Sequence, residues 1–358
     1  MERNSLISER YLLRGAPNAR DLGGLPTMDG RKVRTGLLLR SGELAGITDA
    51  DAHTLSQYPL RTVIDFRTDL EREQKPDRVL AGVRYIHCPI VQQTATGLTR
   101  EEHADPYAAV VTHAKTMAGK ERAFMCAMYR SLVTREFSVD HYRQFFALLL
   151  AQTDGALLYH CTAGKDRVGV GTMLLLTALG VDWPVIVENY LITNERMAAS
   201  TDCLLTAVKD YDLTEAERDV IRTFDSADAE FLTAARDAAA QRCGSMDAFL
   251  SQALGVGAQH AHAHGVESAG PHATRAAGKQ GAQALAHLCR GLVGEGEGED
   301  IVRSHPLLDH IGDARSEYAR LARPGARNDE RRRIVVHHRL PLGLIQAFQY
   351  LRFHNVQI

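Results

Sequence analysis

The stretch His160-Cys161-Thr162-Ala163-Gly164-Lys165-Asp166-Arg167-Val168-Gly169 decides how the central part of this chain folds. Before it lies the short apolar run 155–159, which is suited to a buried strand, and after it lies the apolar run 170–179, which has the length of a helix. The ten residues therefore predict a loop that joins the end of a strand to the start of a helix.

A loop in this position is suited to bind an anion. Backbone N–H groups at a helix N-terminus lack intrahelical partners and carry the positive end of the helix dipole, so the turn from Cys161 to Arg167 can wrap a phosphate dianion. The same field should favour the thiolate of Cys161 over its thiol. Between and beside these two residues, we expect substrate contacts from Thr162, Ala163, Gly164, Lys165 and Val168.

The side chains of the loop suggest separate roles. Cys161 is the predicted nucleophile, and the planar fork of Arg167 can grip two phosphoryl oxygens. His160 has two interpretations: a group that bonds the loop backbone and helps to hold the thiolate, or a core histidine at a strand end. Lys165 is expected at the rim, where its charge suits a multiply anionic substrate, although an exposed lysine is often only solvated.

Three stretches upstream of the loop carry a resemblance. These are 18–24 (NARDLGG), 40–44 (RSGEL) and 63–68 (VIDFRT), and the segment 188–194 (ENYLITN) continues it downstream to about Leu254. With the loop, they resemble the atypical, dual-specificity-like tyrosine phosphatases of bacteria and fungi, a family that includes secreted mycobacterial and listerial enzymes. The resemblance implies an α/β fold with a central, mostly parallel sheet flanked by helices.

Two positions depart from the pattern of that family. Most members have a hydroxyl residue after the loop arginine, where it helps the cysteine to leave, but this chain has Val168, so turnover of the intermediate is expected to be slow. Relatives place an acidic residue just after the third strand as the general acid, and 87–92 (HCPIVQ) offers none.

The general acid is therefore sought elsewhere. Asp166 in the loop is the first candidate, Asp65 at a strand end is the second, and Asp105 is the third. Asp65 and Arg20 are also predicted to bind substrate. The alternative for Asp65 is a structural partner of Arg20 or Arg67.

Composition and charge set broad limits. The 358 residues are 45% hydrophobic and 24% charged, which is enough to bury a substantial core, and the formal charge of −2 gives no general attraction to nucleic acid. No stretch has the apolar length of a membrane span and no signal peptide is recognisable, so the expected location is the cytoplasm, with export still open. The six cysteines form no CxxC pair, which argues against a zinc site and a disulfide framework. No cofactor or metal is expected.

Apolar patterns divide the chain. Strands are expected at 61–66, 85–90 and 157–160, and a catalytic domain at 1–255. Within it, 92–140 is longer than a strand-to-helix connection needs and has helical spacing from 107 to 132; it is either a lid near the site or a cover for the sheet. The segment 256–358 holds ten of the 16 histidines and has no amphipathic period, so a disordered tail is favoured over a metal site.

The predicted function is a cysteine-dependent phosphomonoester hydrolase, a protein-tyrosine phosphatase of broad specificity that works through a phosphocysteine intermediate. A phosphoinositide phosphatase is one alternative, because Lys165 and Arg167 share a loop. Another is a phosphate-binding module with weak catalysis, and a third is sulfur or arsenate transfer through the loop cysteine. The expected partner is a phosphorylated protein or a phosphoinositide.

Overall fold

The structure is a computed structural model that describes residues 13–92, 107–256 and 266–267. The described residues leave out Asp105. They also leave out the first part of the predicted insertion and nearly all of the predicted tail at 256–358. The division of the chain at residue 255 therefore stays a prediction.

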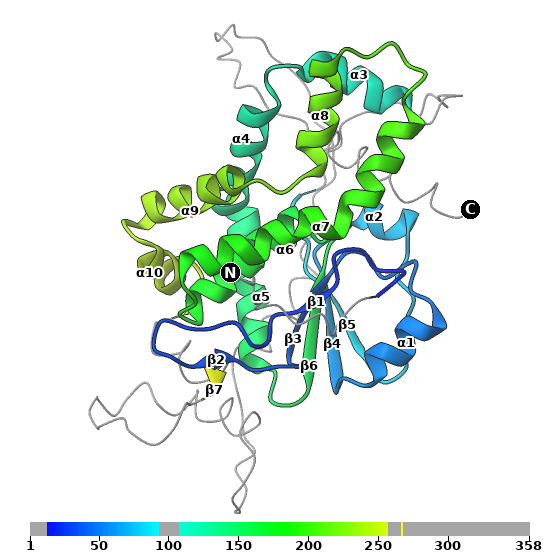
Figure 1. The fold of residues 1–358 in the computed structure, drawn as a ribbon. Helices are drawn as coiled ribbons and strands as arrows, with labels where there is room; N and C mark the ends of the chain where they lie inside the picture. The colour runs from blue at the N-terminus through cyan, green and yellow to red at the C-terminus, as the bar shows by residue number, and fades with distance from the viewer. Residues whose placement is uncertain (1–12, 93–106, 257–265, 268–358) are drawn as a thin grey trace, which may run out of the picture. The chain divides into compact units, whose positions relative to one another are not determined.

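The centre of the fold is a five-stranded sheet in the order β1-β3-β6-β4-β5 (Figure 1). Its strands are β1 (Arg20–Asp21), β3 (Leu38–Ser41), β6 (Ala156–His160), β4 (Leu60–Asp65) and β5 (Arg84–His87). Four of them run parallel, and β1 pairs antiparallel with β3 at one edge. A separate short pair joins β2 (Lys32–Val33) to β7 (Val266–Glu267). The mostly parallel sheet expected from the sequence is confirmed.

The register of the sheet brings several strand ends together. His160 at the end of β6 lies opposite Ser41 of β3 on one side and Asp65 of β4 on the other, and Asp65 lies opposite His87 of β5. Ligands of parallel α/β sheets bind outside the carboxyl ends of the strands. The loop 160–169 therefore starts at the edge where a binding site is expected.

The predicted strands follow from apolar sequence. Every residue of β6 is buried, as is typical of a parallel strand covered on both faces. All three predicted strands are present, but β5 ends at His87, before the predicted residue 90. Pro89 follows two residues later and cannot donate a backbone hydrogen bond to a neighbouring strand.

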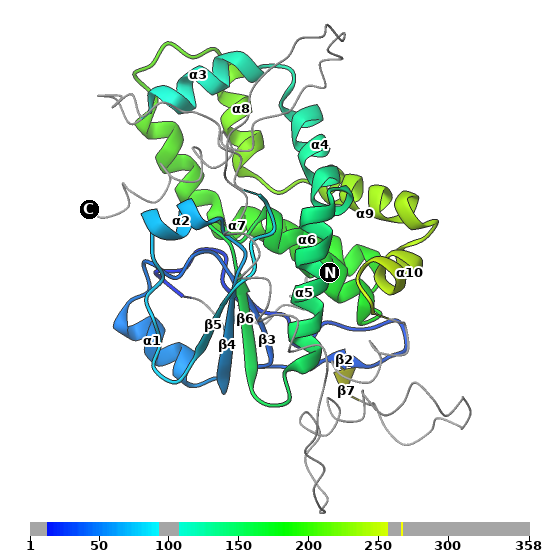
Figure 2. The ribbon, with the colours of Figure 1, turned by 180° about the vertical axis from the view of Figure 1, so that it is seen from behind.

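Helices cover both faces of the sheet (Figure 2). On one face, Leu55 of α1 (Asp49–Ser56) shares an apolar cluster with Val63 and Leu158. On the other face, α5 (Glu136–Ala151) and α6 (Asp166–Ala178) share a second cluster with Ile64 and Tyr159. Nearly every residue of α6 is buried, so this helix runs through the interior with the loop 160–169 at its start.

The helical part of the predicted insertion forms two helices, α3 (Ala108–Met117) and α4 (Glu121–Thr134), which a turn at Gly119 with φ of 76° separates. The later helices are α7 (Trp183–Ala207), α8 (Glu215–Asp225), α9 (Ala229–Cys243), α10 (Met246–Ala248) and a π-helix at Phe249–Ala253. Helix α4 packs along α9, and α3 packs along α8. Buried side chains of α3 and α4 join the same core cluster as the sheet, which supports the covering role; the lid stays a prediction.

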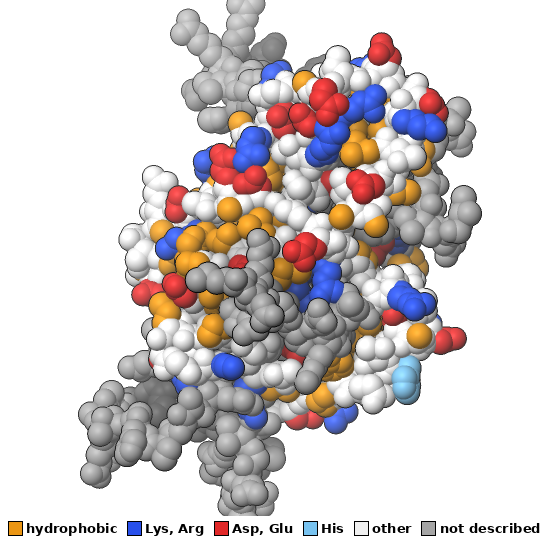
Figure 3. Space-filling model, viewed as in Figure 1, with side chains coloured by type: hydrophobic (Ala, Val, Ile, Leu, Met, Phe, Trp, Pro, Cys, Tyr) orange, Lys and Arg blue, Asp and Glu red, His pale blue; other side chains and the backbone are white. Residues whose placement is uncertain are grey.

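Charged groups of both signs are interspersed over the face of the molecule drawn in Figure 3, in keeping with the small formal charge of −2. Within the described residues, every helix is too short or too polar to cross a membrane.

Candidate active site

The loop between β6 and α6 has the predicted strand-loop-helix geometry. Strand β6 ends at His160 and α6 begins at Asp166, so residues 161–165 make the turn. Gly164 has φ of 65°, and a Cβ built there would lie 2.6 Å from the backbone N of Gly42. Only glycine fits this left-handed conformation and this close approach.

The carbonyl groups of the loop are bonded by groups outside it. The Thr162 carbonyl accepts from the Glu43 N–H at 3.0 Å, and the Gly164 carbonyl accepts from Asn18 Nδ2 at 2.7 Å and from Arg40 Nη2 at 2.6 Å. In a planar trans peptide the C=O and the following N–H point in opposite directions. The N–H groups of the residues after these carbonyls therefore face the interior of the loop, as an anion-binding bowl requires.

Cys161 lies at the start of the bowl, and its side chain is buried with 1% exposure. Burial raises the pKa of the thiol above its ordinary value, while the charge of Arg167 and the N–H of Val168, which donates to the sulfur, oppose this rise. The negative charges of Asp166 and Glu71 add to it. The expectation of a thiolate favoured by the loop field is thus corrected, because desolvation and the nearby carboxylates outweigh the cation and the amide.

Arg167 is held by Glu71, a residue that the sequence analysis did not identify. Arg167 Nη1 and Nη2 donate to the two carboxylate oxygens of Glu71 at 2.7 Å each, and Thr162 Oγ1 donates to the same carboxylate at 2.6 Å. Despite burial, these partners lower the pKa of Glu71 to about 2. The guanidinium is therefore held in one fixed orientation, and its charge acts on Cys161.

The position of Glu71 had a local signal in the sequence. It lies in the first turn of α2 (Asp69–Gln74), where Thr68 and Glu71 form a capping box: the Thr68 N–H donates to Glu71 Oε2 at 2.8 Å. The capping box predicts the helix start. The contact with Arg167, 96 residues later in the chain, has no sequence signal.

Glu71 should make the fold sensitive to acid. Its pKa falls from an ordinary 4.5 to about 2 on folding, so its contribution to stability is complete above pH 4.5 and is lost as the pH falls through 2. We expect Glu71→Gln to lower the free energy of unfolding at neutral pH by about 3 kcal/mol, a gap that closes on acidification. Urea denaturation of both proteins over this pH range measures it. Asp69→Asn, an exposed acidic residue of the same helix, is the control, and a gap that does not change with pH would refute the assignment.

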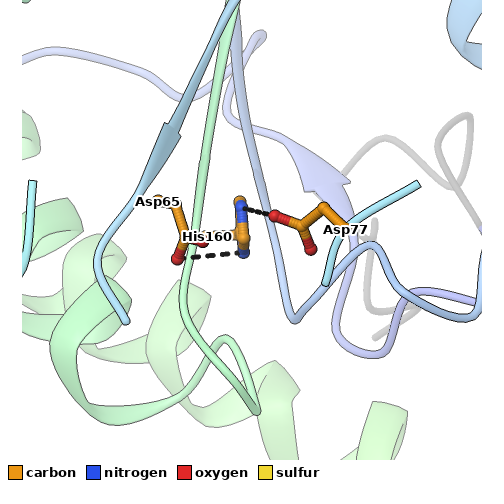
Figure 4. A group of neighbouring side chains, drawn as sticks. All are labelled: Asp65, Asp77 and His160. Carbon is orange, nitrogen blue, oxygen red and sulfur yellow. Dashed lines mark ion pairs between the residues drawn. The ribbon is translucent and has the colours of Figure 1, made fainter. Parts of the chain in front are cut away.

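His160 lies in a buried ionic cluster directly behind the loop (Figure 4). Its Nε2 lies 3.1 Å from Asp77 Oδ2, its Nδ1 lies 3.9 Å from Asp65 Oδ1, and Nδ1 is 3.4 Å from the Cys161 carbonyl oxygen. Burial lowers the pKa of His160, but the two carboxylates raise it by more, so the imidazolium is favoured. The histidine is a core residue that also contacts the loop backbone, and its role in holding the thiolate stays a prediction.

Asp65, Asp77 and His160 offer ligand atoms within 4.8 Å of one another, a spacing that a metal ion could use. Arg67 argues against this use, because its Nη2 lies 2.8 Å from both Asp65 Oδ2 and Asp77 Oδ2. A divalent cation would have to displace or repel that guanidinium. The group is better described as a charge-balanced cluster that supports the end of β6.

Asp166 and Lys165 lie at the start of α6, on the side of the helical cluster. Asp166 Oδ1 accepts from the Tyr129 hydroxyl at 2.8 Å and lies 3.3 Å from Lys165 Nζ. Lys165 Nζ also donates to the carbonyls of Phe224 at 2.6 Å and Ser226 at 3.2 Å. Lys165 is 1% exposed, so its expected position at the rim is wrong. Carbonyl groups at the C-terminal end of a helix carry partial negative charge, which attracts the ammonium group inward.

Asp65 and Arg20, the other two predicted substrate-binding side chains, are buried and bonded to other groups of the protein. Asp65 is 5% exposed and pairs with Arg67, which confirms one of its structural alternatives. Arg20 is fully buried and donates to the carbonyls of Asn18 at 3.1 Å and Asn189 at 2.9 Å. A direct contact of either with substrate is therefore not supported. The third candidate acid, Asp105, lies outside the described residues.

Comparison with known proteins gives a consistent result. Residues 11–263 match the family model described as "Tyrosine phosphatase family". A protein of Cupriavidus necator named as a tyrosine-protein phosphatase is 34% identical over 251 residues, which cover 69% of this chain and 85% of that protein. The triple specificity protein phosphatase PtpB of Mycobacterium tuberculosis is 29% identical over 267 residues, covering 67% of this chain and 92% of PtpB. Among solved structures, P. aeruginosa TpbA in complex with phosphotyrosine has a TM-score of 0.22 at 16% identity, covering 54% of this chain and 90% of TpbA.

Proposed function

Because the chain belongs to the tyrosine phosphatase family and is thus a phosphoric monoester hydrolase, we propose that it works through a phosphocysteine intermediate on Cys161. The observation that carries this proposal is the loop itself: its carbonyls are bonded from outside, its amides face inward, and Cys161 and Arg167 stand at its two ends. This arrangement matches a phosphoryl group with its three equatorial oxygens.

The proposed reaction has two steps. In the first, the Cys161 thiol releases its proton to water, and the resulting thiolate attacks phosphorus in line. The S–P bond forms and the P–O bond to the leaving group breaks while Arg167 and the loop amides hold the equatorial oxygens. Asp166 delivers a proton to the leaving oxygen. In the second, water attacks the phosphocysteine, Asp166 takes a proton from that water, and the sulfur leaves as thiolate.

Asp166 stays our first candidate for the proton transfers because it lies next to Arg167 at the end of the loop. It begins the helix that follows the loop, and its Oδ1 is fixed by the hydroxyl of Tyr129, which also contacts the hydroxyl of Tyr190. Burial raises the pKa of Tyr129 well above its ordinary value, so its hydroxyl stays a neutral donor. Asp65, the second candidate, is bound by the guanidinium of Arg67, which disfavours its protonated form.

The substrate class follows from the site less directly. One relative is named a triple specificity phosphatase, which supports a broad specificity that includes phosphotyrosine. The argument for phosphoinositides rested on Lys165 and Arg167 together, and the ammonium of Lys165 is instead bound by the carbonyls of Phe224 and Ser226. We therefore favour phosphorylated proteins. A panel of phosphotyrosine, phosphoserine and inositol phosphates, compared by kcat/KM, tests this choice.

Val168 bears on the second step. It is fully buried in the first turn of α6, and its N–H donates to the Cys161 sulfur, so the residue lies close to the reacting group. A hydroxyl there could stabilise the departing thiolate, and valine supplies none. Slow hydrolysis of the phosphocysteine is thus expected, which also fits the alternative of a weakly catalytic phosphate-binding module.

We expect Val168→Thr to accelerate decay of the phosphocysteine by about tenfold, the effect of one added hydrogen bond. Rapid-quench measurement of the burst and of the following steady state on p-nitrophenyl phosphate reports both steps. Val170→Thr, the same change at a fully buried position two residues further on, is the control. An unchanged steady state with no burst in either protein would mean that dephosphorylation does not limit turnover.

A further inference from the structure

Two arginines lie behind the loop without acidic partners. Arg20 and Arg40 are both fully buried, and no carboxylate among the described residues forms an ion pair with either. Burial lowers the pKa of both arginines. Repulsion from the charge of Arg40 lowers the pKa of Arg20 further. Burying a cation without a counter-charge costs stability, so these residues call for a functional reason.

Arg40 donates to one carbonyl of the loop, and Arg20 bonds the asparagine that donates to the same carbonyl. Arg40 Nη2 donates to the Gly164 carbonyl at 2.6 Å, and its Nη1 donates to Thr172 Oγ1 at 3.0 Å. Asn18 Nδ2 donates to the same Gly164 carbonyl at 2.7 Å. Arg20 donates to Asn18 Oδ1, which fixes the amide so that its NH₂ group faces Gly164.

The hydrogen bonds from Arg40 and Asn18 to the Gly164 carbonyl also orient the N–H group of the same peptide. Because the peptide is planar and trans, holding the Gly164 carbonyl outward directs the Lys165 N–H inward, toward the position of the phosphoryl group. A cationic donor on the carbonyl also polarises the peptide and strengthens that N–H as a donor. Burial lowers the pKa of Arg40, and the groups that oppose this shift include Cys161 once its thiol has lost its proton.

We propose that Arg40 and Asn18 are positioning residues that clamp the Gly164 carbonyl and so aim the Lys165 amide at the phosphoryl group, while the unpaired charges of Arg40 and Arg20 balance the bound anion. The counter-charge absent from the protein would then be supplied by the substrate dianion and the phosphocysteine. Neither arginine touches the substrate. The inference deepens the proposed function and rests on it.

The test separates binding from stability. Arg40→Met should weaken inhibition of p-nitrophenyl phosphate hydrolysis by inorganic vanadate by about tenfold to a hundredfold, the loss of one charge-assisted contact. Its urea denaturation midpoint should stay unchanged or rise, because an unpaired buried charge is removed. Arg40→Lys keeps the charge but not the fork and should recover part of the vanadate affinity.

Arg67→Met is the matched control for stability. Arg67 is equally buried but pairs with Asp65, Asp77 and Glu43, so its loss removes a shared cation from three buried carboxylates and should lower the denaturation midpoint. If Arg40→Met does not fold, Asn18→Asp tests the proposal instead. Aspartate tolerates the φ of 59° and can pair with Arg20. It also places an oxygen against the Gly164 carbonyl and neutralises the charge of Arg20. It should weaken vanadate inhibition to a similar extent.

The outcomes are distinguishable. A wild-type protein that neither hydrolyses p-nitrophenyl phosphate nor responds to vanadate would overturn the proposed function. A wild-type protein that does both, with Arg40→Met or a folded Asn18→Asp inhibited by vanadate as strongly as the wild type, would overturn the clamp alone.

Discussion

Cys161→Ser should reduce release of phosphate from p-nitrophenyl phosphate by about 10⁴-fold or more, because the serine hydroxyl is far harder to ionise than a thiol and cannot form the phosphocysteine. Binding of inorganic phosphate should persist, since the loop amides and Arg167 that hold the oxygens are unchanged. A continuous assay of p-nitrophenolate and calorimetric titration with phosphate measure the two effects separately.

The matched control is Cys126→Ser, a buried cysteine of α4 in which the same atom is exchanged outside the loop. It should leave turnover within about twofold of the wild type. Turnover of Cys161→Ser at the wild-type rate would remove the covalent mechanism, whatever the result for phosphate binding.

Asp166→Asn should lower kcat by about 10² to 10⁴-fold, with a loss that depends on the leaving group. Asparagine can still accept from Tyr129, so the local structure is kept, but it has no proton to give. Phenyl phosphate, whose leaving oxygen is strongly basic, should lose most of its rate, whereas p-nitrophenyl phosphate should lose much less. The ratio of kcat for the two substrates is the measurement.

Asp65→Asn is the control for the second candidate acid. Asp65 pairs with Arg67 and lies near His160, so its replacement should reduce stability without changing the preference between the two leaving groups. Equal losses for both substrates in Asp166→Asn, or a leaving-group effect in Asp65→Asn instead, would transfer the role of acid away from Asp166.

Much of the fold could be read from local pattern. The apolar runs at 61–66 and 157–160 predicted buried strands, and the spacing from 107 to 132 predicted helices. Each pattern shows which residues of one strand or helix share its buried face. Strand β5 ended early at a point where proline interrupts pairing. The alternative roles of 107–132 were not separable, because a lid and a cover have the same amphipathic spacing.

The site was less accessible to such reasoning. Lys165 appeared to be a rim cation, but the structure turns it onto carbonyls at the end of α8, some 60 residues away in the sequence. Cys161 was expected to favour the thiolate, whereas burial and neighbouring carboxylates raise its pKa. Asn18 and Arg40 were visible as parts of motifs, yet their shared contact with Gly164 was not.

By itself, the sequence determined that a cysteine and an arginine flank a loop between a strand and a helix, because that geometry depends on consecutive residues and on backbone chemistry. Only the tertiary structure decided which side chains surround the loop: Glu71 on Arg167, Tyr129 on Asp166, and Arg40 with Asn18 behind Gly164. Those contacts join segments separated by 37 to 146 residues, and the burial and charge that they create arise when the chain has folded.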